Sequence, residues 1–179
     1  MTFDKFTIKA QEAVQQAITI AQNGSQQAIE PVHLMLGIMN KGKDVVNFIF
    51  QKLGINGIQI EQLLNTELSH LPKVQGGQPY LSNDTNQILQ NAENISKKMG
   101  DEFVSIEPML MALLTTKSTV SSILKDAGCS EKEMQKAIEE LRQGQSVKSQ
   151  SGDENYQALK KYARDLVEDA KNGNLDPVI

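Results

Sequence analysis

The apolar residues near the N-terminus recur at steps of three and four positions, which is the spacing of one face of a helix. This first stripe begins near Thr7, ends at Asn23-Gly24-Ser25, and consists of Ala10, Ala13, Val14, Ala17, Ile18 and Ala21. The next segment opens with Pro31, a residue well suited to the first turn of a helix. Its residues from Leu34 to Met39 are apolar nearly all round. That pattern predicts a helix buried at the centre of its structural unit.

Two further helices are predicted to complete this unit. The third carries Val45, Val46, Phe48, Ile49 and Leu53, and the fourth carries Ile60, Leu63, Leu64 and Leu68. Gly54, which follows the third helix, suits a left-handed C-cap. The same order of segments returns between residues 80 and 142, where Ser130 and Glu133 form a capping-box pattern for the last helix.

The order of segments recurs because the sequence contains an internal repeat. The sequence Glu30-Pro31-Val32-His33-Leu34-Met35-Leu36 comes back as Glu107-Pro108-Met109-Leu110-Met111-Ala112-Leu113. Apolar positions on either side correspond as well, at offsets of 75 or 74 positions: Val14 with Leu89, Ala17 with Ala92, and Ile49 with Ile123. We therefore expect Glu30 and Glu107 to be equivalent residues of two copies of one unit.

The repeat predicts an all-α fold made of a duplicated four-helix unit, with repeat one at residues 1–70 and repeat two at residues 80–142. The prolines and glycines of residues 71–79 exclude regular structure, so this segment is expected to connect the repeats. A seam between two stacked halves is a natural place for a groove. We expect the functional site to lie at that seam.

The remainder of the chain is expected to divide into a linker and a further helix. Serine and glycine dominate residues 146–155, which predicts a flexible linker after a repeat domain at residues 1–145. Helical spacing resumes in residues 156–179, interpreted as a helix and the start of a further domain. The apolar stripe of this helix consists of Tyr156, Leu159, Ala163, Leu166, Val167 and Ala170, and Asn172-Gly173 ends it.

Charge and composition exclude several classes of protein. The formal net charge is −4, the pI is near 5.3 and no basic stripe occurs, which argues against a nucleic-acid partner. No apolar run approaches the roughly 20 residues of a membrane span, and the N-terminus lacks a signal-peptide pattern. A single cysteine, Cys129, rules out an internal disulfide and fits a reducing compartment. We therefore expect a cytoplasmic protein that binds neither nucleic acid nor membrane.

Catalytic chemistry is sparse in this sequence. No G-x-x-x-x-G-K-[ST] loop for a nucleoside triphosphate occurs. The two histidines, His33 and His70, are far apart, and His33 is expected to be a hydrogen-bonded core residue. Cys129 follows Gly128 at a helix junction and is expected to pack as a small apolar residue. We predict no catalytic residue, no metal site and no cofactor in this chain.

The duplicated unit with Glu-Pro at its second helix resembles the Clp N-terminal domain. Phe6-Thr7, Leu71-Pro72-Lys73-Val74 and Gly100-Asp101 are similar to the ClpB branch of that family. The tail resembles the same branch through residues 156–166 and Leu175-Asp176-Pro177-Val178-Ile179. The resemblance covers the whole chain, whereas the repeat motif alone would also fit the ClpA and ClpC branches.

This resemblance implies an N-terminal domain that captures exposed hydrophobic segments of unfolded or aggregated polypeptides for a homohexameric, ATP-driven disaggregase. ATP and Mg²⁺ would bind in AAA+ domains outside this chain, and a DnaK-type chaperone system would act through other missing domains. The fragment itself would be monomeric and without catalytic activity. The alternative, implied by the ClpA and ClpC branches, is a platform that docks a folded adaptor or regulatory protein. An enzyme that uses His33 or Cys129 is a third alternative.

The resemblance also implies polar site residues, which here are Thr7, Asp101 and Glu107. Two of them have a structural alternative to a binding role. Thr7 is equally well explained as a helix cap, and Glu107 as an acid that complements a helix dipole.

An apolar floor for the groove is expected from Ile88, Leu89 and Phe103. Pro108 follows Glu107 at a position where a leucine-specific contact would otherwise be expected. The surface required to bind clients of varied sequence is a modest hydrophobic patch with an acidic rim, because only a surface that can repack accepts many partners.

Overall fold

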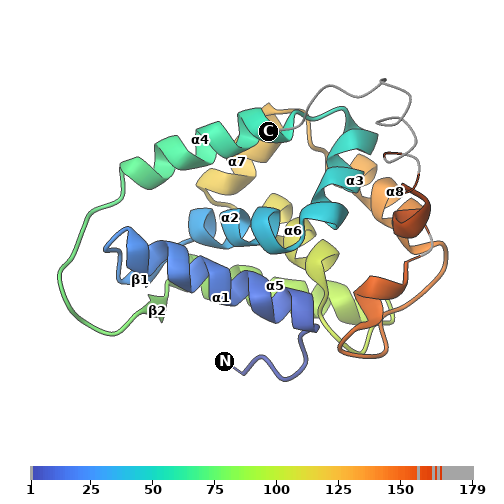
Figure 1. The fold of residues 1–179 in the computed structure, drawn as a ribbon, viewed down its shortest axis with the longest axis horizontal. Helices are drawn as coiled ribbons and strands as arrows, with labels where there is room; N and C mark the ends of the chain where they lie inside the picture. The colour runs from blue at the N-terminus through green and yellow to red at the C-terminus, as the bar shows by residue number, and fades with distance from the viewer. Residues whose placement is uncertain (1, 157, 163, 165, 167–179) are drawn as a thin grey trace.

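The computed structural model describes residues 2–156, 158–162, 164 and 166, and these are mainly helical (Figure 1). Repeat one contains α1 (Ile8–Asn23), β1 (Ala28–Ile29), α2 (Pro31–Lys41), α3 (Lys43–Leu53) and α4 (Gly57–Ser69). Repeat two contains β2 (Tyr80–Leu81), α5 (Asn83–Lys98), α6 (Ile106–Thr115), α7 (Thr119–Asp126) and α8 (Glu131–Arg142), and the short 3₁₀ helix η1 (Gly152–Asn155) follows it. The predicted duplicated four-helix unit is confirmed. Among the described helices, none has the length and apolar character needed to cross a membrane.

Helices α2 and α6 contact each other at the centre of the domain (Figure 1). Every residue from Pro31 to Ile38 is buried, as is every residue from Ile106 to Leu114. Helix α1 packs on α2, and α5 packs in the same way on α6. A helix covered on all sides has no solvent-facing stripe, so the sequence of α2 is apolar all round, as predicted.

Two short parallel pairings join the repeats to each other. Strand β1 pairs with β2, where Ile29 lies opposite Leu81. An isolated bridge joins Phe6 to Val104. The two pairings are equivalent in the repeat. Leu81 is the repeat-two counterpart of Phe6, and Val104 is the counterpart of Ile29, each at an offset of 75 positions. The chain just before α1 thus pairs with the loop after α5, and the chain just before α5 pairs with the loop after α1. This exchange interlocks the two repeats.

The structure corrects the alignment of the two Glu-Pro motifs. Glu30 is the N-cap of α2, whereas the N-cap of α6 is Ser105, and Glu107 is the second residue of α6. The N-caps of α1 and α5, Thr7 and Ser82, are likewise 75 positions apart. The prediction that Glu30 and Glu107 are equivalent is therefore wrong by two residues. A helix that is apolar on all sides has no polar face to fix its register, so the shift was hidden in the sequence.

Residues 146–155, expected to form a flexible linker, lie against the repeat domain. Val147 is fully buried, and its carbonyl oxygen accepts a hydrogen bond from the amide of Glu102 at 2.8 Å. The carbonyl oxygen of Gln150 accepts one from the amide of Ile8 at 2.8 Å. This packing differs from the expected free linker because it depends on backbone groups, which every residue type supplies and composition does not reveal. The division into a domain, a linker and a further domain stays a prediction.

The segment beyond Tyr156 is helical in residues 158–162, 164 and 166. Tyr162 packs edge-on against Phe48 of α3, with ring centroids 5.5 Å apart. The remainder of the predicted helix, its end at Asn172-Gly173 and the segment Leu175–Ile179 lie outside the described residues.

Candidate functional site

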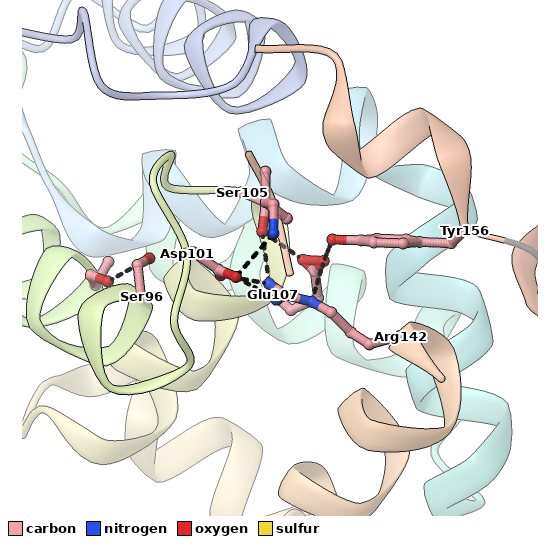
Figure 2. A network of polar contacts seen from close by, with 8 residues as sticks. Ser96, Asp101, Ser105, Glu107, Arg142 and Tyr156 are labelled. Atoms are coloured by element: carbon pink, nitrogen blue, oxygen red, sulfur yellow. Dashed lines mark hydrogen bonds and ion pairs between the residues drawn. The ribbon is translucent and has the colours of Figure 1, made fainter. Parts of the chain in front are cut away.

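Asp101 and Glu107, two of the polar residues predicted to bind polypeptide, lie in one buried network at the start of α6 (Figure 2). Asp101 follows α5, and its two carboxylate oxygens accept hydrogen bonds from the terminal nitrogens of Arg142 at 2.7 and 2.8 Å. Charge-assisted bidentate pairs of this kind are strong and directional. Arg142 is the last residue of α8, so this pair fixes the end of α8 to the loop between α5 and α6.

Glu107 enters the network from the first turn of α6. Its Oε2 accepts a hydrogen bond from the hydroxyl of Ser105 at 2.8 Å, and its Oε1 accepts one from the hydroxyl of Tyr156 at 2.6 Å. The same Oε1 lies 3.6 Å from Nε of Arg142, whose Nη2 also donates to Ser105 at 3.1 Å. Figure 2 shows these groups converging from α6, α8 and the segment that follows α8.

Thr7 is the N-cap of α1, and its hydroxyl makes two contacts. The oxygen accepts a hydrogen bond from the amide of Ala10 at 3.1 Å, and the hydroxyl donates to Oδ2 of Asp153 at 2.9 Å. Thr7 and Asp153 are both buried. The capping alternative for Thr7 is thus confirmed, and the structure adds a link to Asp153 that the sequence did not predict.

We refer to Thr7, Asp101, Ser105, Glu107, Arg142, Asp153 and Tyr156 as the polar cluster. Burial, followed by the charge of Glu107, raises the pKa of Asp153 to about 6. Burial disfavours the charged form of Arg142, but Glu107 and Asp101 outweigh this effect and hold the pKa of Arg142 above its ordinary value. Burial and Glu107 also raise the pKa of Tyr156, so its hydroxyl remains protonated as a donor.

The apolar residues predicted for the groove floor are mostly inside the core. Ile88 and Leu89 of α5 are fully buried, and Pro108 of α6 is buried as well. Phe103 is half-buried, and the ammonium nitrogen of Lys5 lies 5.9 Å from its ring centroid. In this structure Ile88, Leu89 and Pro108 contribute to packing, and their binding role stays a prediction.

A groove does exist at the junction of the repeats, but other residues form it. It has a volume of about 870 Å³ and lies between α3 and α8, beside Ala158, Lys161, Tyr162 and Leu166 of the tail. Phe48 and Tyr162 supply part of its apolar lining. Lys52 of α3 and Glu140 of α8, which also line it, form an exposed ion pair at 3.2 Å. The seam therefore holds a groove with a charged wall rather than the expected floor of Ile88, Leu89 and Phe103.

A second groove, which the sequence pattern did not reveal, lies within repeat one, and we call it the repeat-one groove. It has a volume of about 670 Å³ and is walled by α1, α2, α3 and α4. Its apolar lining consists of Ile20, Leu36, Met39, Ile55, Ile58 and Leu68, and four amides, Asn40, Asn47, Asn56 and Asn65, stand among its polar residues. The available signal was on α4, where Ile58 is an apolar residue that lies off the stripe of Ile60, Leu64 and Leu68 and is 66% exposed.

His33 and Cys129 have the structural roles expected of them. The Nδ1 atom of His33 accepts a hydrogen bond from the amide of Glu30 at 2.9 Å, and its Nε2 lies 3.2 Å from the side-chain oxygen of Gln26. Burial lowers the pKa of His33 to about 4, which keeps the ring neutral. Cys129 is buried, and burial together with Glu133 raises its pKa to about 11, so it is a poor nucleophile. Within the described part of the chain, no three His, Cys, Asp or Glu side chains are placed to hold a metal ion.

Comparison with known proteins identifies the family. A family model described as "Clp repeat (R) N-terminal domain" matches residues 5–127. The chain belongs to the Clp N-terminal domain family. A curated relative of this family, "Chaperone protein ClpB" of Bacteroides thetaiotaomicron, is 58% identical over 179 residues, which are 100% of this chain and 21% of the relative. The ClpB of Porphyromonas gingivalis is 48% identical over the same shares of the two chains. The chain thus spans about a fifth of the length of these relatives, as the N-terminal region of a ClpB chaperone.

Solved structures show the same fold in other members of the family. The Hsp104 N-terminal domain from Candida albicans has a TM-score of 0.72 and 22% identity, over 84% of this chain and 99% of that one. The N-terminal domain of ClpD from Arabidopsis thaliana has a TM-score of 0.59 and 19% identity, over 76% and 94% of the two chains. At these identities the likeness establishes the fold of this Clp N-terminal domain and nothing finer.

Proposed function

We propose that this Clp N-terminal domain binds exposed hydrophobic segments of unfolded or aggregated polypeptides for a ClpB-type disaggregase. The supporting observation is the repeat-one groove, an open and partly apolar surface on a member of a chaperone family. In this proposal the longer protein is a cytoplasmic homohexamer that hydrolyses ATP with Mg²⁺ in AAA+ domains and works with a DnaK-type system. The present chain supplies binding and no catalysis.

The chemistry of the repeat-one groove suits an extended segment of varied sequence. Ile58 is 66% exposed, so an incoming side chain can bury it at no cost to the fold. Met39, at the groove wall, has a flexible side chain that adapts to ligands of different shape. Asn40 and Asn65 are exposed, and an amide both donates and accepts hydrogen bonds, as a peptide backbone requires. The groove thus offers apolar contact and backbone pairing without selecting one sequence.

A double substitution in this groove tests the proposal. Met39→Ser with Ile58→Ser is expected to weaken client binding at least tenfold, because burying one such side chain contributes about 1.5–3 kcal/mol. The measurement is a fluorescence-anisotropy titration of a labelled, permanently unfolded protein, such as reduced and alkylated α-lactalbumin, with the 179-residue chain.

A matched control uses an exposed apolar residue outside this groove. Val74 is 46% exposed in the loop between the repeats, and Val74→Ser is expected to change affinity less than about twofold. Equal losses in both variants, or no loss in the double variant, would contradict the assignment. A domain that only docks folded adaptors would show no NMR shifts in the groove when the unfolded client is added, so this spectrum separates the two functions.

A further inference from the structure

Residues 147–156, which we call the latch segment, contact all three of the polar residues predicted to bind polypeptide. The hydrogen bonds join Thr7 to Asp153 at 2.9 Å, Asp101 to the amide of Val147 at 2.9 Å, and Glu107 to the hydroxyl of Tyr156 at 2.6 Å. Thr7 and Glu107 are fully buried, and Asp101 is 9% exposed. While the latch segment is in place, a binding partner has no route to these side chains.

Three buried side chains anchor the latch segment: Val147, Asp153 and Tyr156. Two of them suit a buried position, since Val147 is apolar and the hydroxyl of Tyr156 has Glu107 as its acceptor. Asp153 is different. Its Oδ2 accepts the hydrogen bond from Thr7, but its buried Oδ1 has no hydrogen-bond partner among the described residues. A buried carboxylate oxygen without a partner is costly when the group is ionised.

The charges that face Asp153 make its ionisation more costly still. Glu107 faces it from α6 as a like charge, and Lys9, a half-buried residue of α1, opposes that effect more weakly. Arg142 of α8 pairs with Asp101 through both of its terminal nitrogens, and no ion pair joins it to Asp153 among the described residues. An ionised Asp153 would therefore add a buried negative charge that no cation among the described residues contacts.

We propose that the latch segment is a pH-controlled cover, which is seated while Asp153 is protonated and leaves its seat when Asp153 ionises. Its departure uncovers Thr7, Asp101 and Glu107 for a partner. The inference concerns the seat of this segment and holds whether or not the repeat-one groove binds clients.

The direction of the pH dependence follows from the pKa of Asp153. Seating raises it from an ordinary value of 3.8 to about 6, so the protonated form favours the seated state. The seat is therefore fully stable below about pH 4 and is weakened as the pH rises through 6. Opening releases a proton only between the two pKa values, so the equilibrium constant for opening should increase by up to about tenfold for each pH unit between 4 and 6 and level off above 6, where Asp153 is ionised in both states.

Hydrogen exchange on the 179-residue chain measures this opening directly. The reporters are the amides of Ile8 and Glu102, which donate to the carbonyl oxygens of Gln150 and Val147 across the seat. After correction for the intrinsic pH dependence of exchange, their protection is expected to fall about thirtyfold between pH 4 and 6 and to change little above pH 6.5. Amides inside α2, away from the seat, serve as the internal reference and should keep constant protection.

Two variants decide whether Asp153 is the titrating group. Asp153→Asn removes the charge and is expected to abolish the pH dependence while the reporter amides stay protected at pH 7. Glu154→Gln changes the exposed neighbouring acid and should leave the wild-type slope intact. A flat profile in the wild type, or the wild-type slope in Asp153→Asn, would overturn the proposal.

A third variant guards against failure of Asp153→Asn to fold. Thr7→Val removes the hydrogen bond that the carboxylate of Asp153 accepts, so the opening transition should move to higher pH. Thr7→Ser keeps the hydroxyl and should titrate like the wild type. A transition that stays in place in Thr7→Val would also overturn the proposal.

Discussion

Replacing Arg142 with methionine is expected to lower the free energy of unfolding by about 3–5 kcal/mol. The guanidinium is 5% exposed and binds Asp101 through two hydrogen bonds and Ser105 through a third. The Oε1 atom of Glu107 also lies 3.6 Å from Nε of Arg142. Methionine has similar length and no charge, so the variant leaves two buried acids without their cation, which costs far more than the pair itself contributes. Urea denaturation followed by circular dichroism at pH 7 gives the value.

The matched control breaks an ion pair of the same kind at the surface. Lys52 and Glu140 lie 3.2 Å apart, with their side chains 49% and 58% exposed. Lys52→Met should cost less than about 1 kcal/mol, because water solvates the remaining carboxylate. A loss for Arg142→Met as small as that for Lys52→Met would show that the polar cluster is not a structural charge network.

The fold was predictable from the sequence because its main signal is local. The stripe on α1, the wholly apolar α2 and the glycine after α3 each depend on residues within one or two turns of a helix. Gly54, for example, has φ 71°, the left-handed geometry that its position after a helix predicts. The alignment of Glu30 with Glu107 was wrong because apolar residues surround both, and such residues do not indicate which face of the helix points outward.

The partners of the site residues could not be predicted, since they come from distant parts of the chain. Thr7 and Asp153 are 146 positions apart, and Asp101 and Arg142 are 41 positions apart. In the sequence, Arg142 is an ordinary basic residue at a helix end and Asp153 lies in a serine-rich stretch. Only the folded chain shows that Arg142 faces Asp101 and that Asp153 faces Thr7.

The two repeats have diverged at positions that line the repeat-one groove. From the N-caps of α4 and α8 onward, the copies are offset by 74 positions, which aligns Ile58 with Lys132 and Leu68 with Arg142. In repeat one both positions line the open repeat-one groove. In repeat two, the residue aligned with Leu68 is the buried cation of the polar cluster. One copy thus supplies an accessible apolar groove and the other a sealed charged site.

We expect Gly37→Ala to lower the free energy of unfolding markedly, because α1 and α2 pack closely at this residue. A methyl group at Gly37 of α2 would lie 2.3 Å from the carbonyl oxygen of Ala13 and 3.0 Å from the amide nitrogen of Ala17, both in the backbone of α1. Backbone atoms cannot rotate away, so α1 must shift as a unit. Overpacking of this severity costs about 3 kcal/mol, against the roughly 1 kcal/mol that alanine gains as a helix former. The free energy of unfolding should therefore fall by about 2 kcal/mol or more.

Gly57→Ala is the matched control for this substitution. A methyl group at Gly57, the first residue of α4, meets only a ring carbon of Phe50 at 3.5 Å, an ordinary contact. That variant should be neutral or more stable by up to about 1 kcal/mol. In repeat two the position equivalent to Gly37 is Ala112, 75 positions later, so α6 already accommodates a methyl group at this place. If urea titration shows equal stability for Gly37→Ala and the wild type, α1 moves away from α2 freely, and the close approach of these helices does not hold repeat one together.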